Sequence, residues 1–437
     1  MAITNRAWSR IVGISLAALL GLSAVGPAKS LVTHAASPTK LVFWFNDDPG
    51  WIKAYNGLIA GYTKLHPNVT ITAQHYSFGN LPIKLQTVIG TSSAPDVVGI
   101  YGTSVTSFVR AGKFDPIPSS VYTADQIKAT YFPAATNAGF YQGKYYSLPH
   151  EYGVENGGML VDPAAFKAAG IASYPTTWAE LKADAAKLTI KKGGNIKRAG
   201  FLFTSAGGPP AFFLALLLQQ QGGHYLASDG IHVDFNTPQA AAAMQEMQNF
   251  QQYGDERDFP VSVLDVSDYL FRHQAAMAFR GPWTIAYGQG SYPKVKFDYT
   301  LLPSFTSQPP YFAAESGWSD VVTTGSAHKD VAWDFLKYVN SKDNDRAWNI
   351  TTSSIPSRTD LVTDPAFLKL NPLLKPILGR LQYGRWIGPI LNRDAYFNGI
   401  RRYCVKVFTH ELSVTDALKQ MTTELNAAVD KQLGSGQ

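Results

Sequence analysis

The stretch LVFWF at residues 41–45 is a short continuous apolar run, as a strand buried on both faces of a parallel sheet requires. Apolar residues then recur at three- and four-residue spacing over 51–65, which predicts a helix. Residues 69–73 (VTITA) alternate like a strand, 82–90 predict a second helix, and 96–101 (DVVGIY) a third strand. Strand–helix–strand–helix order predicts an α/β fold with a largely parallel sheet.

The second half of the chain predicts longer helices. Thr177-Trp-Ala-Glu180 is a capping box that starts a helix to about Leu188. Thr237 is an N-cap before Pro238 and predicts a helix to about residue 253. Amphipathic spacing predicts two more helices, at 329–340 and 415–433. Because no repeat and no low-complexity linker is found, we expect two α/β lobes.

The composition is globular but rich in aromatic rings. Of 437 residues, 45% are apolar, which excludes wholesale disorder. Only 16% are charged, whereas 24 Phe, 22 Tyr and 9 Trp are present. A core does not need that many rings, so some are expected to line a surface that meets the flat apolar face of a ligand.

The N-terminus has the pattern of a secretion signal. Arg6 and Arg10 precede an apolar stretch over 11–25, and small residues follow at Ala28 and Ala35. An uncleaved anchor is the alternative, but the stretch is short and polar-interrupted, so we predict a cleaved signal peptide over residues 1–35. The mature protein is then secreted, and is expected in the periplasm or at the extracellular face of the cytoplasmic membrane.

Charge and cysteine content exclude several classes of protein. Removing 1–35, which holds three basic residues and no acid, lowers the formal charge of +6 by three, and no basic run remains to bind nucleic acid. Cys404 is the single cysteine, so an intramolecular disulfide is excluded. Because Cys404 lies far from the signal, it cannot carry an anchoring lipid.

Catalytic and metal-binding motifs were sought and not found. None of the nine histidines lies three or four residues from another, and no nucleophile elbow or phosphate-binding loop occurs in a suitable context. We therefore expect no metal ion and no cofactor. Carboxylates pair at Asp47-Asp48 and at Glu151 near Glu155, but sequence does not supply the distance that a glycosidase requires. Adjacent Asp47 and Asp48 are also typical of a turn or a helix cap.

Aromatic rings stand beside polar groups at the ends of several predicted elements. A sugar stacks its C–H face on Trp or Tyr, while Asp, Glu, Asn and Arg bind its hydroxyls. Core packing remains the alternative for each single ring. The clusters are 44–48, 101–104, 151–152, 281–283, 315–318 and 385–386.

Several segments, in order, resemble the extracellular solute-binding proteins of ABC transporters, in the sugar-binding family that includes maltose-binding protein. The most specific is AAMAFRGPWTI at 275–285, and the resemblance spreads from residue 41 to about 433. The others are LVFWFNDDPGW at 41–51, SAPDVVGIYG at 93–102, YYSLP at 145–149, VAWDFLKYVNS at 331–341 and IPSRTDL at 355–361.

The resemblance implies a two-lobed periplasmic-binding-protein-like fold with a ligand cleft between lobes and several hinge crossings. Lobe 1 would comprise 38–147 and 303–342, and lobe 2 would comprise 148–302 and 343–437. The chain would be a monomeric receptor, not an enzyme, that captures a mono- or oligosaccharide and delivers it to permease subunits in the membrane.

By position, the resemblance implies twelve ligand-binding residues. Trp283 matches a stacking tryptophan, and Asp48 matches a carboxylate that takes sugar hydroxyls. Phe397 lies in a late segment that returns to the cleft. The full set is Asn46, Asp47, Asp48, Tyr101, Thr103, Glu151, Tyr152, Trp283, Glu315, Trp318, Arg385 and Trp386.

The chain departs from the family pattern at two places. Met159-Leu-Val-Asp162 replaces the usual Tyr-Asn-Lys-Asp, and Pro49 stands where the closest sugar binders carry Lys. These changes leave the specific sugar open.

Three other functions stay open. The same fold could take a glycerol-phosphate-type ester, with Arg385 or Arg358 binding the phosphate through its two-pronged guanidinium. A secreted glycoside hydrolase would use the same rings with two acids. A metal receptor would use tyrosines such as Tyr145 and Tyr146, although these two fit strand positions better.

Overall fold

The computed structural model describes residues 38–437 apart from 154–156, 204–206, 221, 223–224 and 435–437. The predicted signal peptide lies outside the described residues.

The first part of the chain builds a five-stranded sheet in the order β2-β1-β3-β13-β6. β1 (Thr39–Asn46) pairs in parallel with β2 (Val69–Tyr76) in unbroken register, and also with β3 (Val97–Tyr101). These strands confirm the prediction from the first apolar run. β13 (Trp318–Val322) and β6 (Leu148–Pro149) come from later in the chain, and β13 runs antiparallel to both of its neighbours.

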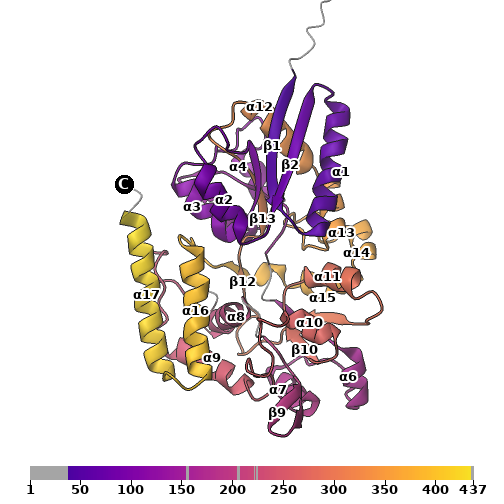
Figure 1. The fold of residues 1–437 in the computed structure, drawn as a ribbon, viewed down its shortest axis with the longest axis vertical. Coiled ribbons are helices and arrows are strands. Elements are labelled where there is room, and N and C mark those ends of the chain that lie inside the picture. Colours follow the sequence, from indigo (N-terminus) through magenta and orange to yellow (C-terminus); the bar gives the residue numbers. More distant parts are fainter. Residues whose placement is uncertain (1–37, 154–156, 204–206, 221, 223–224, 435–437) are drawn as a thin grey trace, which may run out of the picture. The chain divides into compact units, whose positions relative to one another are not determined.

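Three helices of the same region follow directly from the sequence. α1 (Pro49–Leu65) buries Trp51, Tyr55, Leu58 and Tyr62, one face at helical spacing. α2 (Asn80–Val88) and α12 (Lys329–Val339) agree with the predictions to within two residues at each end. Figure 1 shows α1 running beside the β1–β2 pair.

The second part contains a small sheet whose strands pair antiparallel, unlike β1, β2 and β3. β7 (Gly158–Val161) lies between β10 (Met277–Phe279) and β11 (Asp298–Leu301), and both pairs are antiparallel. A separate parallel pair joins β12 (Phe312–Ala314) to β14 (Gly384–Trp386).

Helices supply most of the second core. α8 (Gly208–Gln220) is apolar on all sides, and Phe212 to Leu218 have no exposed surface. It packs against α9 (Pro238–Phe250) and α16 (Arg393–Phe408), and α16 lies beside α17 (Val414–Gly434), as Figure 1 shows. Cys404 is buried in this core, and burial raises the pKa of its thiol well above the usual range.

The remaining elements are short. The helices are α3 (Gly102–Arg110), α4 (Ala124–Thr130), α5 (Pro133–Thr136), α6 (Pro163–Ala168), α7 (Trp178–Leu188), α10 (Val266–Phe271), α11 (Thr284–Ser291), α13 (Lys342–Thr352), α14 (Pro365–Leu370) and α15 (Lys375–Leu378), with 3-10 turns at Asn137–Gly139, Pro372–Leu374 and Leu381–Tyr383. The strands are β4 (Phe140–Tyr141), β5 (Lys144–Tyr145), β8 (Ile190–Lys192) and β9 (Asn195–Arg198).

Local signals in the sequence are confirmed in detail. The Thr177 hydroxyl accepts from the backbone N–H of Glu180, whose carboxylate accepts from the backbone N–H of Thr177. The Thr237 hydroxyl caps α9 by accepting from the backbone N–H of Ala240. Because that third residue is Ala, it has no carboxylate to accept from the backbone N–H of Thr237. Gly193 and Gly194 both have positive φ, as the tight turn of the β8–β9 hairpin requires.

The chain makes a first passage from one sheet to the other between β6 and β7, and a second passage back from β11 to β13. Trp348 and Phe367 lie in two different hydrophobic cores, so a later segment joins these cores. Gly102 at the start of α3 lies against the second passage, since a Cβ there would come within 2.2 Å of the Glu315 carbonyl oxygen. The lobe boundaries themselves stay a prediction.

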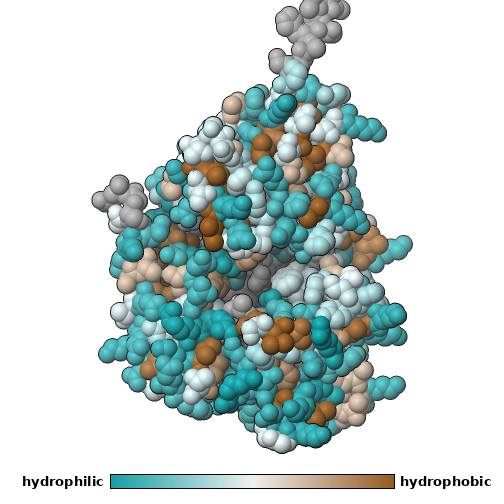
Figure 2. Space-filling model, in the orientation of Figure 1, coloured by the Kyte–Doolittle hydropathy of each residue, from teal (hydrophilic) through white to brown (hydrophobic). Residues whose placement is uncertain are grey.

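Hydrophilic side chains dominate the face of the molecule in Figure 2, and hydrophobic residues form separate patches between them. Within the described ranges, no helix combines the length and apolar character needed to cross a membrane.

Replacing Thr177 by Ala should lower the free energy of unfolding by about 1 kcal/mol, because α7 loses its N-cap acceptor. Equilibrium urea unfolding would measure the change. As a control, exposed Thr423→Ala within α17 should change stability by less than about 0.5 kcal/mol. Equal losses in the two variants would contradict a capping role.

Candidate functional site

One cavity of about 470 Å³ collects side chains from both parts of the chain. Its described walls hold six aromatic rings, three carboxylates and two guanidinium groups. The lining residues are Asn46, Asp48, Trp51, Phe78, Tyr101, Glu151, Gly207, Arg280, Trp283, Glu315, Trp318, Arg393, Phe397 and Asn398.

Four of the rings form one continuous aromatic wall. Trp318 packs edge-on against Tyr101 and Phe78, with ring centres 5.5 and 5.9 Å apart, and against Trp51 at 6.0 Å. Trp318 lies next to Tyr101 because β13 pairs antiparallel with β3 in a register that sets these two residues opposite each other. Edge-to-face packing fixes each ring, so the wall is formed before any ligand arrives.

The end of β1 places two polar side chains at the cavity. The Asn46 amide oxygen accepts from the backbone N–H of Asp48 at 2.9 Å, and one Asp48 oxygen accepts from Gly50 N–H at 2.7 Å. Asp48 is therefore both the N-cap of α1 and a wall of the cavity. Burial raises the pKa of Asp48, although the backbone N–H groups of Gly50 and Trp51 oppose that rise.

Two further carboxylates come from the passages between the two parts. Glu151 follows β6, and Glu315 precedes Ser316 and Gly317, both of which have positive φ. Both acids are about 95% buried, and one Glu151 oxygen accepts from the backbone N–H of Trp318 at 3.3 Å.

Arg280 and Trp283, which both line the cavity, are in contact with each other. The guanidinium carbon of Arg280 lies 4.4 Å from the centre of the Trp283 ring. Arg280 also donates to both oxygens of Asp265, from Nε at 3.1 Å and from Nη2 at 2.9 Å.

Arg393 connects the two parts at the cavity rim. Its guanidinium carbon lies 4.5 Å from the ring centre of Phe78 and 5.4 Å from that of Phe397. Its Nε donates to the Thr103 hydroxyl at 3.2 Å. Its carboxylate partner, Asp394, is largely exposed, so the charge of Arg393 is weakly compensated.

The structure brings seven of the twelve predicted residues to the cavity: Asn46, Asp48, Tyr101, Glu151, Trp283, Glu315 and Trp318. Phe397, named with the late segment, joins them.

The other five do not line the cavity. Asp47 is exposed, and Thr103 is buried behind Arg393. Tyr152 points into the core, where its hydroxyl donates to the Leu381 carbonyl. Arg385 covers the Tyr311 ring, and Trp386 ends β14, half-buried between two cores.

Sequence reasoning missed Phe78, Arg280, Arg393 and Asn398, and read Trp51 only as helix core. Phe78 could have been found, because it follows the end of β2 at the same sheet edge as Asn46. Arg280 lies within the segment 275–285 but was not recognised as a site residue there, and Arg393 lies in none of the resembling segments, so only the three-dimensional packing brings both to the cavity.

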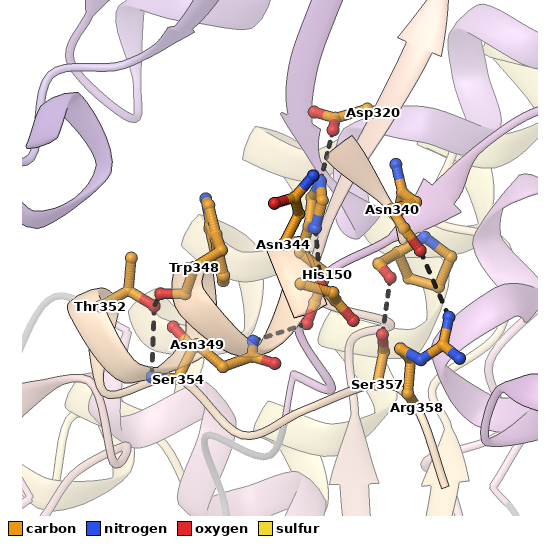
Figure 3. A network of polar contacts seen from close by, with 12 residues as sticks. His150, Asp320, Asn340, Asn344, Trp348, Asn349, Thr352, Ser354, Ser357 and Arg358 are labelled. Carbon is orange, nitrogen blue, oxygen red and sulfur yellow. Dashed lines mark hydrogen bonds and ion pairs between the residues drawn. The ribbon is translucent and has the colours of Figure 1, made fainter. Parts of the chain in front are cut away.

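Beside the cavity lies a buried network of charges (Figure 3). The His150 ring has a carboxylate at each nitrogen: Nδ1 lies 2.8 Å from an oxygen of Asp345, and Nε2 contacts Asp320. All three side chains have no exposed surface. Tyr55 donates to the second oxygen of Asp320 at 3.0 Å.

This arrangement holds His150 as an imidazolium. Burial by itself disfavours the charged ring, but Asp320 and then Asp345 outweigh burial and raise the pKa of His150 to about 10. The backbone of His150 is fixed as well, since its N–H donates to Trp318 and its carbonyl accepts from the Asn349 amide. Glu151, the next residue, is thereby held at the cavity.

Among the described residues, no group of three or more His, Cys, Asp or Glu side chains is placed to hold a metal ion.

Comparison with known proteins identifies relatives. The model of a family described as bacterial extracellular solute-binding protein matches residues 57–376. The maltotriose-binding protein of Pyrococcus abyssi is 23% identical over 346 residues, which cover 77% of this chain and 70% of that protein.

Solved structures share the fold. A cyclic α-maltosyl-1,6-maltose binding protein from Arthrobacter globiformis aligns with a TM-score of 0.76 and 22% identity, over 90% of this chain and 100% of that one. A maltose/maltodextrin-binding domain from Bdellovibrio bacteriovorus, bound to maltotriose, aligns with a TM-score of 0.73 and 20% identity, over 90% of this chain and 100% of that one. The two-lobed fold with a cleft and hinge crossings, implied by the resemblance, is confirmed.

His150→Gln should destabilise the protein by about 3 kcal/mol near pH 6.5, because two buried carboxylates lose the charged partner that they share. The folded pKa lies above the unfolded value near 6.5, so the imidazolium stabilises the fold fully below pH 6.5 and is lost as pH rises through about 10. The deficit relative to wild type should therefore shrink between pH 6.5 and 10.

Urea unfolding at pH 6.0, 7.5, 9.0 and 10.0 would measure this difference. His66→Gln, at a partly exposed position on α1's C-terminal cap, serves as the matched control. A constant deficit across the whole pH range would contradict a charged His150.

Proposed function

The chain belongs to the bacterial extracellular solute-binding proteins, and from that premise we propose that it binds a small saccharide in the cavity of about 470 Å³. In this proposal it is a secreted monomer that delivers the saccharide to the permease of an ABC importer.

One observation carries the proposal: a fixed aromatic wall and three buried or half-buried carboxylates share a single cavity. Trp51, Tyr101 and Trp318 offer ring surface to the C–H face of a sugar. Asp48 and Glu151 offer oxygens that accept from hydroxyl groups. A purely apolar ligand would displace water from these carboxylates without replacing the hydrogen bonds of that water, which costs free energy.

The size of the ligand follows from the volume of the cavity. Ligand pockets generally measure about 300–1,000 Å³, and this cavity lies in the lower half of that range. We propose a ligand of two or three sugar rings, in line with the maltotriose named for the relative and the neighbour.

Binding would act by a shift between open and closed lobes. A saccharide that contacts both lobes binds the closed state more tightly and so increases its population. The permease would recognise that closed state. An affinity in the micromolar range corresponds to about 8 kcal/mol.

The phosphate-ester alternative loses the residues on which it was based. The guanidinium of Arg385 lies over the Tyr311 ring, and that of Arg358 donates hydrogen bonds to the Asp360 carboxylate and the Asn340 carbonyl. Neither arginine lines the cavity.

A thermal-shift screen of the signal-free protein would test the proposal, using maltose, maltotriose, mannobiose, cellobiose and glycerol phosphate. A ligand that binds only the native state adds about 2.7 kcal/mol of stability at a hundredfold excess over Kd. A shift with at least one saccharide is expected. A shift with glycerol phosphate alone, or with nothing, would contradict the proposal.

Trp283→Ala should weaken saccharide binding at least about 30-fold, since truncation of a buried aromatic anchor costs about 2 kcal/mol. Trp386→Ala is the matched control, because that half-buried tryptophan does not line the cavity. Isothermal titration calorimetry would give both affinities, after circular dichroism shows that both variants fold. Equal losses would place the ligand elsewhere.

A binding protein should also leave its saccharide intact. Incubation of the purified protein with each saccharide, followed by a reducing-end assay, is expected to show no turnover. Release of reducing ends that disappears in Glu151→Gln would instead favour the glycoside hydrolase.

A further inference from the structure

Arg280 is held more firmly than the other arginine of the cavity. Its Nε and Nη2 donate to the two oxygens of Asp265. Its guanidinium carbon lies 4.4 Å from the centre of the Trp283 ring, and its backbone carbonyl accepts from the Tyr299 hydroxyl at 3.0 Å. The Arg280 side chain is 17% exposed. The two hydrogen bonds to Asp265 and the contact with Trp283 fix the position and orientation of its guanidinium group.

Asp265, which sets the position of Arg280, is itself fixed. One of its oxygens accepts from the backbone N–H and the hydroxyl of Ser267 at the start of α10. Burial opposes ionisation of Asp265, but the charge of Arg280 and the bonds from Ser267 outweigh it and lower the pKa of that carboxyl. The pair is thus an ionised, mutually neutralising unit.

The guanidinium keeps unused donors. An arginine has five N–H groups, and Asp265 takes two of them. The described residues provide no acceptor for Nη1, although Arg280 lines the cavity. An oxygen of a bound ligand would accept from these remaining N–H groups in place of water.

We propose that Arg280 determines ligand specificity in the proposed saccharide site, by donating from its free guanidinium edge to two neighbouring hydroxyl oxygens of a neutral sugar. Asp265 is the positioning residue that holds this edge in place. The inference rests on the proposed function. It also assigns one face of Trp283 to Arg280, so that a sugar stacks only on the other.

The preference for a neutral ligand follows from charge. Because Asp265 already neutralises Arg280 with two hydrogen bonds, a carboxylate or phosphate gains less from this arginine than from an unpaired one. Among the other charged side chains of the walls, three are carboxylates and one is the guanidinium of Arg393, so the carboxylates outnumber it and disfavour an anion further. Arg280 is therefore a donor of directed hydrogen bonds, with little net attraction for negative charge.

Titration calorimetry on the signal-free full chain would test the inference, with the saccharide panel above and with glycerol phosphate, at 20 and 300 mM NaCl. Arg280→Lys keeps the charge but loses the planar fork, so affinity should fall at least about tenfold. Arg272→Lys, an exposed arginine just after α10, is the matched control and should bind like wild type. Wild-type affinity should change less than about twofold with salt.

A ligand-free measurement checks the role of Asp265. In a ¹H–¹⁵N spectrum, the Arg280 Nε–H should give a slowly exchanging signal that is lost in Arg280→Lys. Asp265→Asn should broaden or shift this signal and weaken saccharide binding at least about fivefold, whereas a merely structural role for Asp265 would leave the signal unchanged.

Each outcome has one meaning. A saccharide that binds wild type and Arg280→Lys equally would overturn this inference and leave the proposed function in place. Preferential, salt-dependent binding of glycerol phosphate would overturn the neutral-ligand assignment. Wild type that binds nothing in the panel would overturn the proposed function, and this inference with it.

Discussion

The rest of the structure depends on the buried bridge Asp345–His150–Asp320. It joins three segments that are far apart in the sequence: the passage after β6, the strand β13 and the helix α13. Two carboxylates without exposed surface could not remain there without the imidazolium between them, because an unpaired buried charge costs several kcal/mol. The bridge therefore fixes Trp318 and Glu151, the adjoining residues that face the cavity.

Local signals made much of the fold predictable. The run at 41–45, the Thr177 capping box and the Thr237 cap depend on neighbours within a few residues, and each appears as the sequence indicates. The antiparallel sheet around β7 was not predictable, because strands of only three or four residues carry no sequence signal for the direction in which they pair.

The site was predictable where it follows strand ends and not where it depends on packing. Asn46 and Tyr101 end parallel strands, and the sheet edge identifies them. Neighbours in extended segments point to opposite sides, so Glu151 reaches the cavity while Tyr152 enters the core. Arg280 acquires its place from Asp265, fifteen residues away, a partner that no spacing rule suggests.

The single buried thiol of Cys404 makes the protein a convenient scaffold for an optical reporter. Its pKa is raised and its side chain is closed off in the core, so it stays a poorly reactive thiol towards maleimide or iodoacetamide dyes. A cysteine introduced at exposed Asn398 on the cavity rim would take a dye selectively, with the native cysteine left in place. Emission from that dye would then follow occupancy of the cavity in real time.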